Sequence, residues 1–116
     1  MTQVKYPLHV ADVLQTAGNI VKHIGWTQKA FARKDGWSVL SSTPGADCFC
    51  ALGAIAKARS QGGRKYHEAF FIQAFTEMVP EVGKSVACWN DAHLRSQGEV
   101  AAAFYAAAER IREQHA

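Results

Sequence analysis

The stretch CFCALGAIAKAR, residues 48–59, decides how we expect the chain to fold. It is rich in small apolar residues and follows Asp47, a typical N-cap, so it predicts a helix from about Cys48 to Arg59. Gly53 inside this helix costs about 1 kcal/mol of helix stability relative to alanine. A glycine at such a position usually means that another backbone approaches closely. We therefore expect this helix to be central and tightly packed.

Apolar residues at helical spacing predict further helices around this one. Their expected ranges are residues 8–24, residues 65–79, a short turn at residues 84–91, and a last helix after Ser96. Gly25 and Pro80 end the first and third of the long helices, and Ser96 forms a capping box with Glu99. The residues that we expect to meet in one core are Val13, Ile20, Phe70, Phe75, Val100 and Phe104.

The pair Asp35-Gly36 is a strong signal for a tight β-hairpin turn. A two-residue turn at this pair sets three cross-strand pairs, which are Lys34 with Trp37, Ala32 with Val39, and Phe31 with Leu40. The predicted fold is α+β and mostly α: a compact bundle of four to five helices with one small hairpin at about residues 30–40. We expect residues 1–116 to form a single globular domain.

Composition narrows the class of protein. Of the 116 residues, 48% are hydrophobic and 20% are charged, which is typical of a globular protein and not of a disordered one. The net charge of +3 is small for a dedicated nucleic-acid binder. No apolar run approaches the roughly 18 residues of a membrane span, and the N-terminal residues do not resemble a signal peptide. Three cysteines do not suit a disulfide framework, so we expect a cytoplasmic protein without membrane contact.

Four blocks of sequence occur in a specific order: GWTQ at 25–28, CALGA at 50–54, WND at 89–91 and RSxxEV at 95–100. From about residue 25 to residue 111 the chain resembles an uncharacterised family of small bacterial and phage proteins with this pattern. The resemblance implies no established activity. The matching positions are Gly25, Trp26, Thr27, Gln28, Cys50, Gly53, Trp89, Asn90, Asp91 and Arg95. Ser96 stands where the pattern has threonine, and Cys48, Cys88 and His93 lie outside the pattern.

The two tryptophan-led blocks have two interpretations. In the simpler one they form a corner, in which Trp89 anchors the core, Asn90 and Asp91 turn the chain, and Arg95 pairs with Asp91. In the other they form one cleft, because aromatic walls with a few convergent polar groups are typical of a small-ligand or peptide pocket. The residues of this candidate site are Trp26, Thr27, Gln28, Trp89, Asn90, Asp91 and Arg95. We expect a non-enzymatic protein of phage or bacterial origin that docks a protein partner or a small ligand through this GWTQ/WND surface.

The alternative is a small cysteine-dependent hydrolase or transferase. Cys50 would be the nucleophile near a helix N-terminus, His93 the base, and Asp91 or Asn90 the group that orients the base. Cys48 and Cys88, with Cys50 and His93, are also zinc-ligand types, but the Cys-x-Cys spacing is not the usual one. We therefore expect no metal and no cofactor.

Two further surfaces are candidates for partners. The helix at 66–79 has a wide apolar stripe and is a candidate homodimer surface. The basic residues around Gly62-Gly63 have the residue types of a phosphate contact, although a solvated loop is the simpler interpretation. They are Lys57, Arg59, Arg64 and Lys65. We do not expect nucleic acid as the partner.

Overall fold

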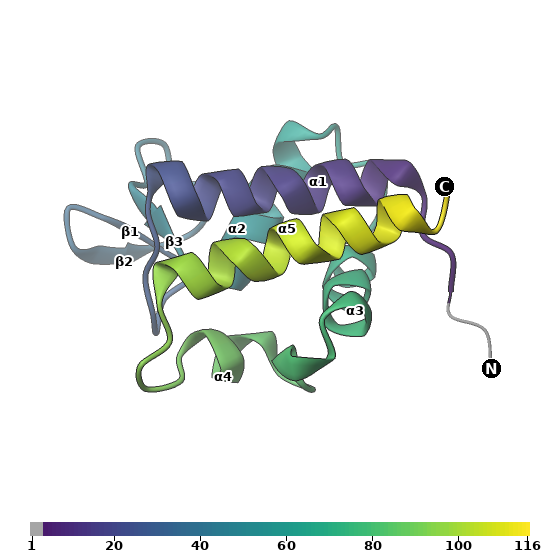
Figure 1. Ribbon diagram of the computed structural model, residues 1–116. Coiled ribbons are helices and arrows are strands. Elements are labelled where there is room, and N and C mark those ends of the chain that lie inside the picture. The colour runs from purple at the N-terminus through teal and green to yellow at the C-terminus, as the bar shows by residue number, and fades with distance from the viewer. Residues whose placement is uncertain (1–3) are drawn as a thin grey trace.

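The computed structural model of the protein describes residues 4–116. Two long helices, α1 (Leu8–Asn19) and α5 (Gln97–Glu113), lie side by side along the molecule (Figure 1). A π-helical turn, η1 (Ile20–Ile24), continues α1, so the predicted helix at 8–24 is confirmed. The capping box of α5 is also confirmed, since Ser96 Oγ accepts from the Glu99 amide and Glu99 Oε1 accepts from the Ser96 amide, both at 3.1 Å.

The remaining helices pack against this pair. α2 (Ala51–Gln61) contacts α1, and α3 (Glu68–Met78) contacts α1, α2 and α5. A 3-10 turn, η2 (Pro80–Val82), and the short helix α4 (Val86–Asn90) lead to α5. Among residues 4–116 no helix is both long enough and apolar enough to cross a bilayer. The predicted class, α+β and mostly α with four to five helices, is confirmed, since residues 4–116 form five α-helices and a small sheet.

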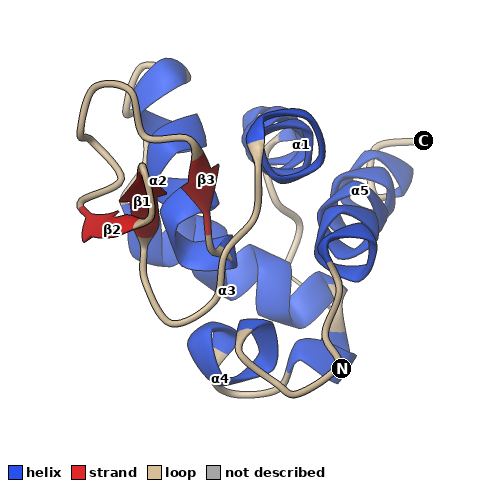
Figure 2. Ribbon diagram, turned by 90° about the vertical axis from the view of Figure 1, so that its left-hand side faces the viewer, coloured by secondary structure: helices blue, strands red, loops and turns tan. Residues whose placement is uncertain are grey.

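A small antiparallel sheet lies at one end of the bundle, beside α2 and on the side of α1 away from α5 (Figure 2). Its strands β1 (Ala32–Lys34) and β2 (Trp37–Val39) form the predicted hairpin, with Lys34 opposite Trp37 and Ala32 opposite Val39. Both turn residues have a positive φ, 51° at Asp35 and 86° at Gly36, as the tight turn requires. The ladder ends at Ala32 and Val39, so the predicted pairing of Phe31 with Leu40 is not part of it.

The predicted start of the CALGA helix is wrong. Cys48 and Phe49 form a third strand, β3 (Cys48–Phe49), which pairs with β1 in the sheet order β2-β1-β3. The N-cap of α2 is Cys50, whose Sγ accepts from the Gly53 amide at 3.3 Å, and not Asp47. Asp47 instead accepts from the Asp35 amide at 3.1 Å. The hydrogen bonds of a distant hairpin therefore override the local helix signal at Cys48 and Phe49.

The predicted close approach at Gly53 is confirmed. A Cβ added at Gly53 would lie 1.9 Å from the carbonyl oxygen of Phe31 and 2.8 Å from its carbonyl carbon. The same oxygen accepts a hydrogen bond from the Cys50 amide at 3.1 Å. The first turn of α2 is therefore seated directly on the backbone that leads into β1.

The core confirms five of the six predicted members, because Val13, Ile20, Phe75, Val100 and Phe104 are buried. The ring of Phe75 stacks on that of Phe104, with centroids 4.5 Å apart. Phe70 is only partly buried, and its neighbour Phe71 is the fully buried residue of that pair. The apolar face of α3 includes both Phe70 and Phe71, so the sequence allows either residue to enter the core. Packing against the other helices buries Phe71.

Candidate functional site

Asn90, the last residue of α4, is fully buried and fully hydrogen-bonded. Its Oδ1 accepts from the indole Nε1 of Trp26 at 2.8 Å and from the amide of Ala51 at 3.0 Å. Its Nδ2 donates to the carbonyl oxygen of Thr27 at 3.1 Å and to Oδ1 of Asp91 at 3.0 Å. A side-chain amide has two acceptor sites and two N–H donors, so all four are used. Asn90 thus ties α4 to the first amide of α2 and to the segment after η1.

Further hydrogen bonds join the same segments. Gln28 Nε2 donates to the carbonyl oxygens of Asn90, at 3.0 Å, and of Ala92, at 3.1 Å. The Lys29 amide donates to Asp91 Oδ1 at 2.8 Å. We call Trp26, Thr27, Gln28, Asn90, Asp91 and the Ala51 amide the Asn90 network. The predicted meeting of the GWTQ and WND blocks is therefore present, and buried polar groups that are satisfied in this way hold a fold in one arrangement.

Trp89 and Arg95 do not belong to this network. The Trp89 ring packs edge-on against Phe75, with centroids 5.9 Å apart, and the Arg95 guanidinium lies 4.7 Å from its centroid. Arg95 forms an ion pair with Glu99 at 3.0 Å, so the predicted pairing of Arg95 with Asp91 is wrong. Trp89 and Arg95 line a separate hollow of about 320 Å³, and residues of α5 form another part of its lining. The seven candidate residues are thus divided between the Asn90 network and this second hollow.

A separate open groove lies next to the network. It has a volume of about 360 Å³, near the lower end of small-ligand sites. It is bounded by the start of the hairpin, the first turn of α2 and α4. We call it the hairpin groove, and its lining residues are Lys29, Ala30, Phe31, Ser38, Cys50, Leu52, Ala87 and Asp91.

The groove includes only two residues of the sequence-based candidate sites, Cys50 and Asp91. Sequence reasoning placed Phe31 in the hairpin ladder and did not single out Leu52 or Ala87. The one available signal was Gly53, because the close backbone approach that it predicted is to Phe31, which lines this groove.

Cys50 lines the groove and is buried, with 6% of its surface exposed. Burial raises its pKa, and the amides of Gly53 and Leu52 oppose that shift. The charge of Asp91 raises the pKa further. These influences favour the neutral thiol, whereas a nucleophile needs the thiolate.

The predicted triad is only partly assembled. Asp91 lines the groove with Cys50, but its carboxylate accepts from the Lys29 and Asn90 N–H groups. His93 is exposed and does not line the groove, and no hydrogen bond within residues 4–116 joins it to Cys50. Over the same residues, no three His, Cys, Asp or Glu side chains are grouped as metal ligands would be.

Fold and site together define a small α+β fold in which a buried, fully hydrogen-bonded asparagine lies beside an open groove. The chain belongs to a family described as "Family of unknown function (DUF6197)", whose model matches residues 5–110. The match includes every residue of the Asn90 network and of the hairpin groove, and it confirms the resemblance to an uncharacterised family. No curated protein and no solved structure matches the chain.

Proposed function

We propose that this protein is a non-enzymatic binding protein and that the hairpin groove, braced by the Asn90 network, is its binding surface. The observation that carries the proposal is an open groove with apolar walls, whose lining includes the buried Cys50 thiol. Phe31, Leu52 and Ala87 supply the apolar walls, and Ser38 and Asp91 supply polar groups at the rim. A few polar groups among apolar ones are the usual chemistry of a recognition site.

The exposed apolar side chains favour a protein partner over a small ligand. Phe31, Trp37 and Leu40, all in or beside the hairpin, are 55%, 78% and 70% exposed. Clustered exposed apolar residues are typical of interaction surfaces. On α3, by contrast, Phe71 and Phe75 are buried within the domain, so the hairpin is a better partner surface than the helix at 66–79.

The sheet offers a way to dock such a partner. β2 is an edge strand that pairs only with β1 among residues 4–116, so an extended segment can add to its other side by strand pairing. Ser38, in the middle of β2, also lines the groove. A side chain of the added segment would then enter the groove beside Ser38. On the resemblance to bacterial and phage proteins, we propose a bacterial partner in the cytoplasm, where free cysteines remain reduced.

The test is selection of binding peptides from an extended-peptide library, followed by amide NMR mapping. We expect shifts at Lys29–Val39, Leu52 and Ala87, and at least about tenfold weaker binding by Phe31→Ala, since aromatic anchors commonly contribute more than 1 kcal/mol. Leu94→Ala is the matched control, because Leu94 is 84% exposed and outside the groove. Selected peptides that map elsewhere, or that bind both variants equally, would refute the proposal.

The second candidate remains a cysteine-dependent hydrolase or transferase. One observation favours it, because Cys50 lines the groove and its Sγ accepts a hydrogen bond from the Gly53 amide. This bond lies at the N-terminus of α2, where the helix dipole would stabilise a thiolate. The raised pKa of Cys50 and the position of His93 weigh against it. The pH dependence of Cys50 alkylation separates the two candidates.

A further inference from the structure

A second polar site lies at the other end of α2. The chain after β2, the last turns of α2 and the start of α3 enclose a hollow of about 170 Å³. We call it the Arg64 hollow, and its lining residues are Ser41, Ser42, Ala56, Lys57, Arg59, Ser60, Arg64 and Glu68. It shares no residue with the hairpin groove. Three cationic and three hydroxyl side chains therefore face one small space, with a single carboxylate.

Among residues 4–116 the cations of this hollow form no ion pair. Within residues 4–116 the ion pairs are Arg95 with Glu99 and Arg112 with Asp12, and neither involves Lys57, Arg59 or Arg64. Three positive charges against the one charge of Glu68 leave the lining at +2. Like charges that converge without counter-charges repel one another, and a bound anion removes that repulsion.

The donors also suit an anion. Arg59 uses Nε to donate to the Tyr66 carbonyl oxygen at 2.5 Å, which fixes the base of its guanidinium and leaves its other N–H groups for a ligand. Ser60 uses its single O–H on the Lys57 carbonyl oxygen at 3.1 Å, so the hydroxyl donors left for a ligand come from elsewhere in the lining. Ser41 and Ser42, in the chain after β2, supply these two hydroxyls. Arginine forks with serine hydroxyls are a common set of donors to phosphate oxygens.

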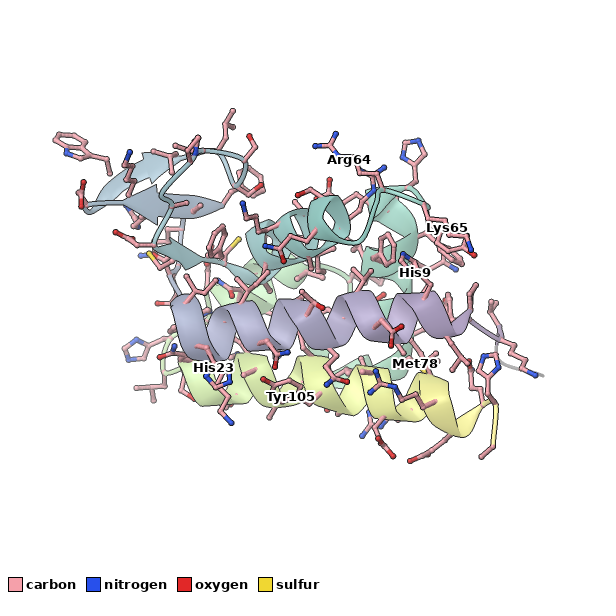
Figure 3. All side chains as sticks on the ribbon, turned by 90° about the horizontal axis from the view of Figure 1, so that it is seen from above. His9, His23, Arg64, Lys65, Met78 and Tyr105 are labelled. Atoms are coloured by element: carbon pink, nitrogen blue, oxygen red, sulfur yellow. The ribbon has the colours of Figure 1, made fainter. Side chains whose placement is uncertain are left out.

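The backbone holds Arg64 at this site. The chain leaves α2 through Gly62 and Gly63, and Arg64 itself has a φ of 58°, in the left-handed region that few non-glycine residues adopt. Its amide donates to the Arg59 carbonyl oxygen at 3.1 Å, so the loop folds back on the last turn of α2. Figure 3 shows Arg64 on this loop, on the side of the domain away from α5. Lys65, next in sequence, lies over the Tyr66 ring at 5.6 Å and is not part of the lining.

We propose that the Arg64 hollow binds a phosphate dianion, either free or as the terminal monoester of a small molecule. The positive charge of the lining favours an anion. The volume of the hollow favours a single phosphoryl group, because about 170 Å³ is well below the roughly 300 Å³ at which small-molecule pockets begin. A phosphate dianion matches the +2 of the lining. This site is independent of the hairpin groove and of the binding function proposed there.

The test is titration of the whole protein with sodium phosphate at constant ionic strength, followed by amide NMR. We expect saturable shifts at Ser41, Ser42, Ser60 and Arg64 with a Kd of about 1 mM or tighter. Arg64→Gln should weaken binding at least about tenfold, the usual effect of losing a charge-assisted pair. The matched control is Lys65→Gln, which removes the same charge one residue away and should leave the Kd within about twofold.

Three results would overturn the proposal: no saturation, equal effects of the two substitutions, or binding of single-stranded DNA but not of phosphate. Equal effects would indicate general charge screening, and the DNA result would indicate a surface for phosphodiesters. Parallel titrations with inorganic phosphate and with phenyl phosphate separate the two sources. Tighter binding of the ester would identify a phosphorylated small molecule, and equal binding would identify free phosphate as sufficient.

Discussion

Gly53→Ala should raise the helix propensity of α2 but also create a clash with the backbone of Phe31. Alanine inside a helix is favoured over glycine by about 1 kcal/mol, so propensity alone predicts a more stable protein. The added methyl, however, would lie 1.9 Å from the Phe31 carbonyl oxygen. That oxygen is held in place by the Cys50 amide at 3.1 Å, and it belongs to backbone and not to a flexible side chain. The clash therefore requires α2 and the hairpin to separate.

The magnitude follows from these terms. Overpacking of this kind costs about 1–3 kcal/mol. Loss or lengthening of the Cys50–Phe31 hydrogen bond costs about a further 1 kcal/mol. After the gain in helix propensity, we expect the free energy of unfolding to fall by about 2 kcal/mol. For a domain of this size that lowers Tm by about 6–10 °C.

The assay is urea unfolding followed by tryptophan fluorescence and circular dichroism. Gly98→Ala in α5 is the matched control, because the nearest atom to its added Cβ is Ser96 Oγ at 4.0 Å. The control should be as stable as the wild type or slightly more stable. If Gly53→Ala behaves like the control, the contact between α2 and the hairpin is not the constraint that we describe.

Three further outcomes are expected. Asn90→Ala leaves two N–H donors, the buried Ala51 amide and the partly buried Trp26 indole, without their acceptor. The free energy of unfolding measured in urea should therefore fall by about 3 kcal/mol, and a fall below about 1 kcal/mol would show that water replaces the amide. Hydrogen bonds from Ser96, and then from Arg95, lower the pKa of Glu99. The contribution of Glu99 to folding stability is therefore present above the ordinary carboxyl pKa, and it is lost as the pH falls through the pKa of Glu99 in the folded protein. Glu99→Gln should therefore flatten the acid side of a Tm–pH profile, and a constant offset at every pH would contradict this origin. Trp37→Ala should change the free energy of unfolding by less than about 0.5 kcal/mol, since the side chain is 78% exposed. The same substitution should weaken peptide binding. A large loss of stability would mean that Trp37 has a structural role.

Much of the fold follows from local signals. The tight turn at Asp35-Gly36 and the capping box at Ser96 are each specified within a few residues, so the hairpin and the start of α5 are predicted from sequence. β3 is not, because it exists only through pairing with β1, and Cys48 and Phe49 taken alone continue a helical pattern. Local patterns thus predict elements, while non-local pairing decides where α2 begins.

The candidate site is predictable to a smaller extent. Two tryptophan-led polar blocks suggested a meeting, and the bond from Trp26 to Asn90 is that meeting. The direction of each side chain was not accessible from the sequence, and Trp89, adjacent to Asn90, packs on Phe75 instead. The hairpin groove was missed because its walls, including Phe31, come from segments that α2 brings together at Gly53.

Alkylation of each cysteine as a function of pH, resolved by mass spectrometry on the folded protein, tests most directly whether the groove binds or catalyses. Cys88 is exposed, Cys48 is partly buried and Cys50 is buried, so the three thiols serve as internal standards for one another. For a binding groove we predict that Cys88 is alkylated first and that Cys50 reacts only slowly while the protein stays folded. Any alkylation of Cys50 in the folded protein should rise only above the ordinary thiol pKa of about 8.5. If Cys50 reacts faster than Cys88 near neutral pH, it is a thiolate in an accessible site, and the cysteine-dependent enzyme becomes the better description of this protein.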